Sequence, residues 1–296
     1  MSNTPVETSR TNRSIVGLDG PLKVRKQTFA YPDDLEVCWN PQLKEFACVA
    51  NSISLLMPYL EPYVVKSVAR AHKQAKAQNL LSVEEDKEIT NYLGQETQHH
   101  IQHRKFNEHL RARYSKLSIL EGLADRLAKR LLRSASMEYN LSQSAASEAF
   151  AFSVARWTAQ YRTEIFAGAD PLVADLFKWH MAEEVEHKHV VFNLWSALAP
   201  SFWRYRVAAV FCVLVMAFFV ITGATMMMAY EKRIFSPLAW FRLIKWGITF
   251  AFELLPNLLV SSLKDFHPDQ FVDPVEVENW LIEFDIRESE QINLKA

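Results

Sequence analysis

Two four-residue stretches, Glu96-Thr97-Gln98-His99 and Glu184-Val185-Glu186-His187, decide how this chain is expected to fold. Residues three positions apart in an α-helix lie on one face, about one turn apart. Each stretch can therefore direct one carboxylate and one imidazole to the same side, as a pair of metal ligands. One such spacing alone is more often a solvated helix face. Two of them, each inside a long segment of helical apolar periodicity, favour a metal site between helices.

The surrounding sequence predicts an almost entirely helical chain. Seven glycines in 296 residues are few for the turns and bulges of a sheet protein. Ser82-Val83-Glu84-Glu85 has the form of a capping box, and Asp170-Pro171 forms a second helix start. Pro58 and Pro62 should kink the first helix because each removes a backbone donor. The expected helices span about residues 42–76, 82–114, 136–166 and 170–200, with a short amphipathic stretch over 117–132.

Helical projection places further ionisable side chains on the inward stripes of these helices. Ser54 shares a stripe with Glu61, and Tyr92 and Asn107 share one with Glu96. Burying unpaired charges costs several kcal/mol each, and no Lys or Arg lies on the stripes, so shared cations explain them better than a salt-bridge network. The candidate ligands are Glu61, Glu96, His99, Glu148, His180, Glu184 and His187, with His103 as a ligand or as the hydrogen-bond partner of one.

Other residues with a suitable side chain are given a structural role. Glu186 and His189 also have the three-residue spacing, but they lie on the opposite side of their helix from the apolar stripe. We expect these two, together with Glu183, at the surface or behind the ligands. The histidines assigned to the core or the surface are His72, His100, His109 and His267.

The ligand set resembles that of the four-helix di-iron and di-manganese carboxylate proteins, which carry two lone carboxylates and two Glu-x-x-His helices. His180, Glu184 and His187 follow the pattern His-x-x-x-Glu-x-x-His, which is similar to the arylamine N-oxygenase branch of these enzymes. The resemblance implies an all-α fold: a ferritin-like four-helix bundle, here followed by a C-terminal membrane-associated helical hairpin.

Several blocks of sequence also resemble the signature of a bacterial family of predicted metal-dependent hydrolases of the ferritin-like di-iron type. The similarity runs from about Tyr31 to the end of the chain and implies the same seven metal-facing residues. Leu60 stands where the family pattern has glycine, and Asn193 where it has aspartate; neither change removes a ligand. The blocks are Met57-Pro58-Tyr59-Leu60-Glu61, Gly94-Gln95-Glu96-Thr97-Gln98-His99-His100, Phe106-Asn107 and Trp179-His180-Met181-Ala182-Glu183-Glu184-Val185-Glu186-His187-Lys188.

Mixed carboxylate and imidazole ligation predicts two iron ions, or a manganese and iron pair, in preference to zinc. The ligand pattern predicts a non-haem di-metal oxidase or oxygenase, an oxidoreductase that uses O2 and an external electron donor. Its expected substrate is a lipophilic small molecule at the membrane surface. Two alternatives stay open: a di-metal hydrolase of an ester or amide, and a non-catalytic metal-binding membrane protein.

A membrane anchor is expected after the bundle. Residues 207–230 form 24 positions without a charge, flanked by arginine and lysine, which is long enough to cross a bilayer as a transmembrane helix. A second apolar stretch over 234–263 contains Arg242, Lys245, Glu253 and Pro256, and predicts an interfacial segment, a re-entrant segment or a poorer second span. One amphipathic helix is expected over 273–286.

These features give a domain plan and a location. The plan is a flexible segment over 1–30, a metal-binding bundle over 31–200, hydrophobic membrane-associated helices over 201–264 and a tail over 265–296. Three cysteines without CxxC spacing and a polar N-terminus predict the inner, cytoplasmic membrane with the metal domain on its cytoplasmic side. A formal net charge of −1 gives no basic excess, so nucleic acid is not an expected partner.

Overall fold

The computed structural model describes residues 22–293, with side chains to residue 290, and its regular elements are all helical. The all-α prediction is confirmed. The helices are α1 Lys44–Ala77, α2 Val83–Arg113, α3 Leu117–Ser134, α4 Met137–Ile165, α5 Pro171–Glu186, α6 Val190–Leu198, α7 Phe202–Tyr230, α8 Pro237–Ser261 and α9 Val275–Asn293, with 3-10 turns η1 Arg233–Phe235 and η2 Pro268–Gln270.

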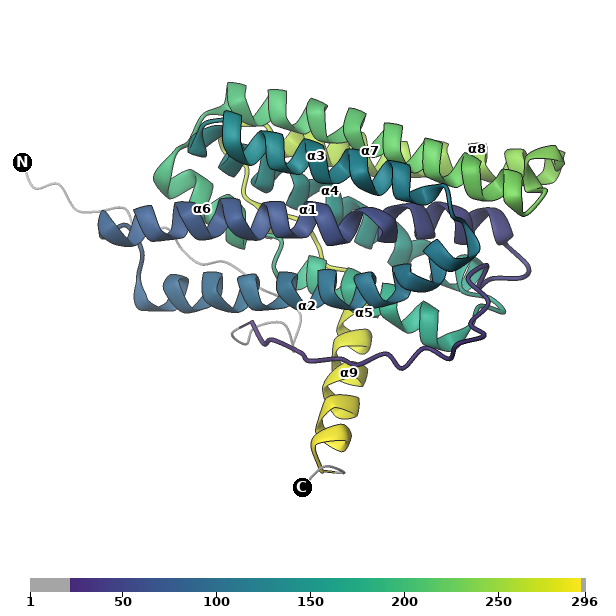
Figure 1. Cartoon of the computed structure of the whole chain (residues 1–296). Helices are drawn as coiled ribbons and strands as arrows, with labels where there is room; N and C mark the ends of the chain where they lie inside the picture. Colours follow the sequence, from purple (N-terminus) through teal and green to yellow (C-terminus); the bar gives the residue numbers. More distant parts are fainter. Residues whose placement is uncertain (1–21, 294–296) are drawn as a thin grey trace, which may run out of the picture.

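Helices α1, α2, α4 and α5 carry all the proposed ligands except His187, which directly follows α5, and they run alongside one another in the body of the molecule (Figure 1). The predicted start signals operate as expected. The Ser82 hydroxyl accepts a hydrogen bond from the backbone N–H of Glu85, and the Glu85 carboxylate accepts one from the backbone N–H of Ser82, which completes the capping box. Asp170 accepts from the backbone of Val173 at the start of α5. Helix α1 continues through both of its prolines.

The expected helix over 170–200 is two helices, and here the prediction is wrong. Helix α5 ends at Glu186, His187-Lys188-His189 form a turn, and α6 begins at Val190. Three consecutive side chains of the turn then have three different partners. His187 faces Glu148, Lys188 pairs with Asp273, and His189 contacts Glu88. A regular helix would impose a fixed rotation between successive side chains. The turn lets these three side chains reach their separate partners without that constraint.

Residues 22–30, which the sequence assigns to a flexible segment, lie along the bundle; residues 1–21 fall outside the described part. The segment is extended, and its burial alternates with period two: Arg25, Gln27 and Phe29 are buried, whereas the residues between them are exposed. Gly94 permits the close approach to α2, because a Cβ there would lie 2.6 Å from the Val24 side chain.

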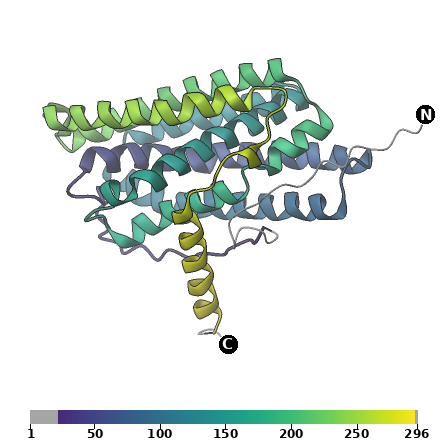
Figure 2. The ribbon, with the colours of Figure 1, turned by 180° about the vertical axis from the view of Figure 1, so that it is seen from behind.

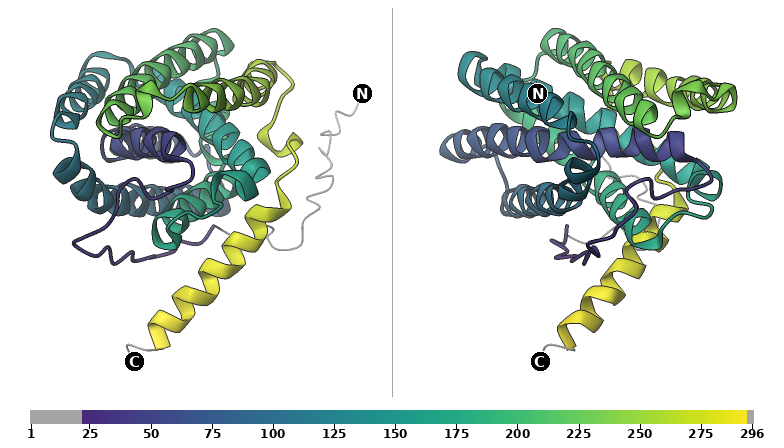
Figure 3. Two further views of the ribbon diagram at one scale, coloured as in Figure 1. Left: turned by 90° about the vertical axis from the view of Figure 1, so that its right-hand side faces the viewer. Right: turned by 45° about the vertical axis from the view of Figure 1, so that its right-hand side comes forward.

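Helices α7 and α8 form an antiparallel layer over α1 and α4 (Figures 1 and 3). Both are long and apolar enough to cross a membrane, although a core helix would pass the same test. The charges of α8 are turned toward the bundle: Arg242 pairs with Glu45, Lys245 with Glu164 and Glu253 with Arg156. The outward faces of the layer carry exposed apolar stripes: Val210, Leu214, Phe218 and Ile221 on α7, and Phe241, Ile244, Ile248, Phe252, Leu255 and Leu259 on α8.

After α8 the chain returns along the back of the bundle and enters α9, which projects from the body (Figures 2 and 3). Four buried side chains fix the start of α9 against the protein: Val277, Trp280, Leu281 and Phe284. The Gln27 side chain also donates to the carbonyl of Phe284. The predicted amphipathic helix is therefore present, and it extends beyond residue 286.

Candidate metal centre

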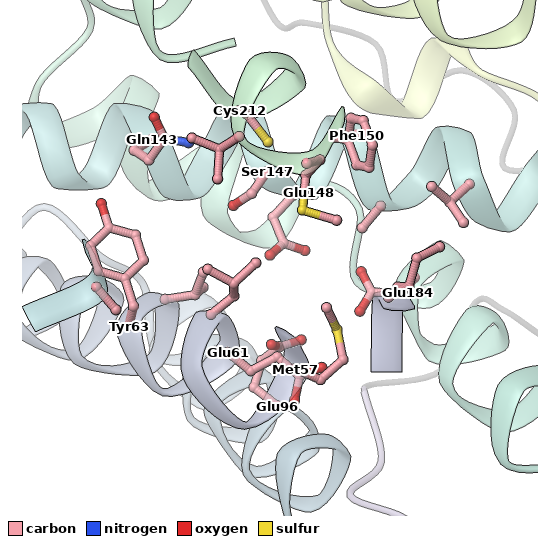
Figure 4. A pocket seen from close by; sticks show the side chains of 18 of the residues that line it. Met57, Glu61, Tyr63, Glu96, Gln143, Ser147, Glu148, Phe150, Glu184 and Cys212 are labelled. Carbon is pink, nitrogen blue, oxygen red and sulfur yellow. The ribbon is translucent and has the colours of Figure 1, made fainter. Parts of the chain in front are cut away.

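The four helices bring their acidic and imidazole side chains to one buried centre. Glu96, His99, Glu184 and His187 each offer a ligand atom, and these atoms lie within 4.8 Å of one another. Glu61, His99 and His180 form a second group by the same measure. The two groups adjoin at His99, and together these buried Glu and His clusters suit a di-metal site. Glu61, Glu96, Glu148 and Glu184 surround the same space in Figure 4.

The strongest sign of an ion-binding site is a set of buried atoms without partners. In the described part of the chain, six ligand atoms at this centre are buried and have no hydrogen-bond partner. Buried polar groups are nearly always paired, and leaving one unpaired costs about 1–3 kcal/mol. The donor set therefore fits a pair of bound cations. The atoms are Glu61 Oε1 and Oε2, Glu96 Oε1, His99 Nδ1, Glu184 Oε2 and His187 Nε2.

The pKa values of the ligands show that several ionisable side chains share one buried site. Burial raises the pKa of Glu184 to about 7, and burial together with Glu96 raises that of Glu61 well above its usual range. Burial alone would lower the pKa of His187, but the carboxylates of Glu184 and Glu148 outweigh this effect, and the pKa is raised to about 9. The carboxyls thus tend to hold protons, and His187 tends to be positive, unless a metal cation supplies the charge.

His99 is oriented by a carboxylate that the sequence assigned to the surface or to a position behind the ligands. Glu183 is fully buried, and its Oε2 lies 2.8 Å from His99 Nε2. This contact leaves His99 Nδ1 to face Glu96 and Glu184, at 3.6 and 3.8 Å. A carboxylate behind a histidine fixes its tautomer and raises its basicity as a metal ligand.

Arg25 compensates the buried charge of Glu183, and the sequence analysis missed this residue. Its guanidinium contacts Glu183 at 3.2 Å, Glu186 at 2.8 Å and Asp285 at 2.8 Å. Arg25 comes from the extended segment before the bundle, so no helical stripe could reveal it. Glu186, expected on the side opposite the ligands, does lie there, and it is covered by this arginine and by Gln95.

His180 is oriented by a chain of hydrogen bonds that begins on α1. Ser54 Oγ donates to Asn107 Oδ1 and must therefore accept from His103 Nδ1, 2.8 Å away. His103 Nε2 is then an acceptor for His180 Nδ1, at 2.7 Å. Burial lowers the pKa of both histidines well below the usual range, so each ring is neutral. The remaining lone pair of His180, on Nε2, faces Glu184 at 2.8 Å and Glu61 at 3.4 Å.

Glu148 and His187 form the other side of the centre. Tyr92 donates to Glu148 Oε1 at 2.7 Å, and Glu148 Oε2 lies 3.1 Å from His187 Nδ1. His187 Nε2 then faces Glu96 Oε1 at 3.3 Å. Glu148 is thus held beside the two groups of ligand atoms rather than within them.

The histidines given a structural role lie away from the centre. His72 pairs with Asp86 at 2.6 Å, and His189 contacts Glu88 at 2.9 Å and is buried rather than exposed. His100 bonds the carbonyl of Glu96, His109 packs on Tyr31, and His267 contacts Asn193.

A cavity of about 120 Å³ borders the centre on the side of α7. Glu61, Glu96, Glu148, His180 and Glu184 form one wall of this cavity. The other walls are mostly apolar and include Met57, Phe150, Cys212 and Met216, with Gln143 and Ser147 as polar exceptions (Figure 4). A small reacting group can therefore reach the ligands while most of its surroundings are shielded from water.

The chain belongs to a family whose model is described as "predicted metal-dependent hydrolase", which matches residues 23–271. In the comparisons with curated proteins and with solved structures, nothing matches the chain. Membership confirms the family resemblance seen in the sequence, whereas the likeness to arylamine N-oxygenases finds no support there.

Membership also corrects the functional prediction. The ligand pattern predicted an oxidase or oxygenase, but the family is described as predicted metal-dependent hydrolases, which fits the alternative of a di-metal hydrolase better. The error arose because carboxylate and imidazole ligands bind the same metals in both kinds of enzyme, so the donor set alone does not specify the reaction. O2 and an electron donor were expected for the oxidase reaction, and hydrolysis requires neither.

Proposed function

We propose that this protein is a hydrolase that uses two metal ions to cleave an ester or an amide. The observation that carries the proposal is the set of six unpartnered ligand atoms at the centre of a bundle whose family is described as predicted metal-dependent hydrolases. When bound, a metal pair polarises a carbonyl and lowers the pKa of water, so that hydroxide forms near neutral pH. Hydrolysis consumes only water, and no redox partner is needed.

The residues of the chain would have three tasks in this reaction. Glu61, Glu96, His99, His180, Glu184 and His187 would hold the cations, with Glu148 beside them. Glu183, His103 and Tyr92 would fix the orientation of ligand side chains through the hydrogen bonds described above. The apolar walls of the cavity would keep bulk water from the reacting carbonyl, which strengthens electrostatic interactions there.

The proposed metals are iron or manganese rather than zinc. Four of the seven candidate ligands are carboxylates, and the described cysteines are free and lie outside the two groups of ligand atoms. Hard oxygen ligands mixed with imidazole suit iron and manganese better than the thiolate-rich or three-His arrangements typical of zinc.

We further propose that the α7 and α8 layer attaches the protein to the cytoplasmic membrane, with the metal domain on the cytoplasmic side. Support comes from the two outward apolar stripes, in which Leu214 is 64% and Phe252 77% exposed. Contiguous exposed apolar patches often mark protein or membrane interaction sites. The ion pairs of α8 face the bundle, so the layer can rest its outer face in lipid without burying a charge there.

The test is ester and amide hydrolysis by protein that has been stripped of metal and reloaded separately with Fe²⁺, Mn²⁺ or Zn²⁺. We expect p-nitrophenyl ester cleavage to return on reloading and to proceed equally fast with and without oxygen. Glu96→Gln should abolish it, whereas Glu108→Gln, an exposed position on the same helix, should match the wild type. Tight metal binding without hydrolysis of either substrate class would favour a non-catalytic protein.

A further inference from the structure

A larger apolar chamber lies between the bundle and the α7 and α8 layer. Its volume is about 570 Å³, within the range of about 300–1,000 Å³ that is usual for small-molecule sites. Residues from α1, α4, α5, α7 and α8 line it, and nearly all are aliphatic or aromatic. The metal centre does not account for a cavity of this size and character.

The chamber adjoins the cavity at the metal centre. The two spaces share lining residues, so they meet along these side chains. One of these residues, Met216, is an unbranched side chain that can adapt to a guest. The shared residues are Ile53, Phe150, Val154, Met181 and Met216.

At its other side the chamber reaches the outward face of the layer. Ile221 on α7 and Leu255 on α8 line the chamber, yet they are 66% and 54% exposed. Gly247 also lines it, and a Cβ at this glycine would meet no described atom within 4 Å. The chamber is therefore open between α7 and α8, on the face that we propose rests in lipid.

We propose that the chamber holds the hydrocarbon chain of a long-chain acyl ester, whose carbonyl lies in the adjoining cavity beside the metal ligands. The chamber can bury methylenes but offers almost no hydrogen bonds, whereas the cavity wall carries the carboxylates and imidazoles that the reaction needs. Each methylene that is buried there leaves water, so binding should strengthen as the chain lengthens. Hydrolysis would break the acyl carbon to oxygen bond, adding hydroxyl to the acyl carbon and a proton to the leaving oxygen. This inference rests on the proposed function for its chemistry, but the chain-binding site can be tested without it.

The test is photolabelling of the full-length protein in phosphatidylcholine nanodiscs, using palmitic acid with a diazirine in the middle of its chain. We expect labelled peptides to include Ile53 on α1 and Val154 on α4, which lie beneath the layer and line the chamber. Excess unlabelled palmitate should remove this labelling. Lipid around the outside of the layer would instead label outward residues such as Phe218 and Phe252. Labelling confined to those residues would overturn the inference.

Two variants sharpen the assignment. Gly247→Phe adds a side chain where the structure has space, and should reduce the labelling of Val154 severalfold. Ile248→Phe changes the next residue, which is exposed and does not line the chamber, and should leave that labelling unchanged. Equal labelling in both variants would also count against the chamber.

Chain-length dependence separates this inference from the proposed function. We expect the wild type to cleave p-nitrophenyl palmitate with a KM at least tenfold below that for p-nitrophenyl acetate, and Gly247→Phe to lose most of this difference. Metal-dependent cleavage without chain preference or chamber labelling would leave the hydrolase standing and remove the chain site. Chamber labelling without hydrolysis of any ester would keep the chain site and remove the hydrolase.

Discussion

Asn107 Nδ2 lies 2.8 Å from the backbone carbonyl oxygen of Ser54, across the interface between α2 and α1. In a regular helix this carbonyl would accept from residue 58, but Pro58 has no N–H to donate. Asn107 Nδ2 donates to this carbonyl instead, and Asn107 Oδ1 is then positioned to accept a hydrogen bond from the Ser54 hydroxyl. The proline on α1 thus helps to fix which nitrogen of His180 faces the metal ligands.

The first prediction concerns the histidine in this chain of hydrogen bonds. His103→Leu would leave His180 Nδ1 without its partner, and loss of such a contact typically weakens metal binding by about 10–100-fold. Competition with a metal chelator measures the effect. His109→Leu, on the same helix but away from the centre, serves as the control. Equal affinities in the two variants would contradict the orienting role of His103.

The second prediction concerns the arginine from the N-terminal segment. Arg25→Ala would leave Glu183, which is fully buried, without its cationic partner. Breaking a buried ion pair in this way typically costs about 3–5 kcal/mol of unfolding free energy. Denaturant unfolding should show this loss, whereas Lys26→Ala at the neighbouring exposed position should stay within about 0.5 kcal/mol of the wild type. A small effect at Arg25 would mean that the segment is not part of the stable fold.

The third prediction follows from the pKa values of the ligands. Glu184, with a pKa of about 7, and His187, with a pKa of about 9, hold protons when the pH lies below these values. A metal ion must displace these protons, so its affinity should rise between about pH 6 and pH 8, by up to about tenfold per pH unit for each proton displaced. Calorimetry in buffers of different ionisation enthalpy would measure the proton release. A pH-independent affinity would contradict the assignment of these two residues as ligands.

The fourth prediction concerns the outward stripes. Leu214→Lys and Phe252→Lys should weaken retention in the membrane fraction, because a lysine deep in a bilayer costs about 2.5–3.5 kcal/mol on insertion scales. Fractionation with salt and carbonate washes is the measurement. Val83→Lys, at an exposed apolar residue on α2, is the matched control. Wild-type protein that stays soluble without detergent would refute the attachment.

Helical periodicity was enough to predict most of the centre. Glu96 and His99, like Glu184 and His187, could be placed together because their spacing is local to one helix, and Ser54, Tyr92 and Asn107 lie on the same stripes as the ligands. Arg25 could not be found in this way, since its contact with Glu183 joins residues 158 positions apart. The turn at His187-Lys188-His189 was also missed, because its side-chain partners lie on other elements, and a local apolar pattern carries no signal for them.

The proposed function is tested most directly by the rate of ester hydrolysis, measured while metal is titrated into stripped, full-length protein. Two overlapping groups of ligand atoms predict a rate that rises with added metal and reaches its plateau at two ions per chain. Glu96→Gln should stay flat under the same titration. A rate of hydrolysis that is already at its plateau without metal, or no hydrolysis at full metal loading, would contradict a two-metal hydrolytic centre.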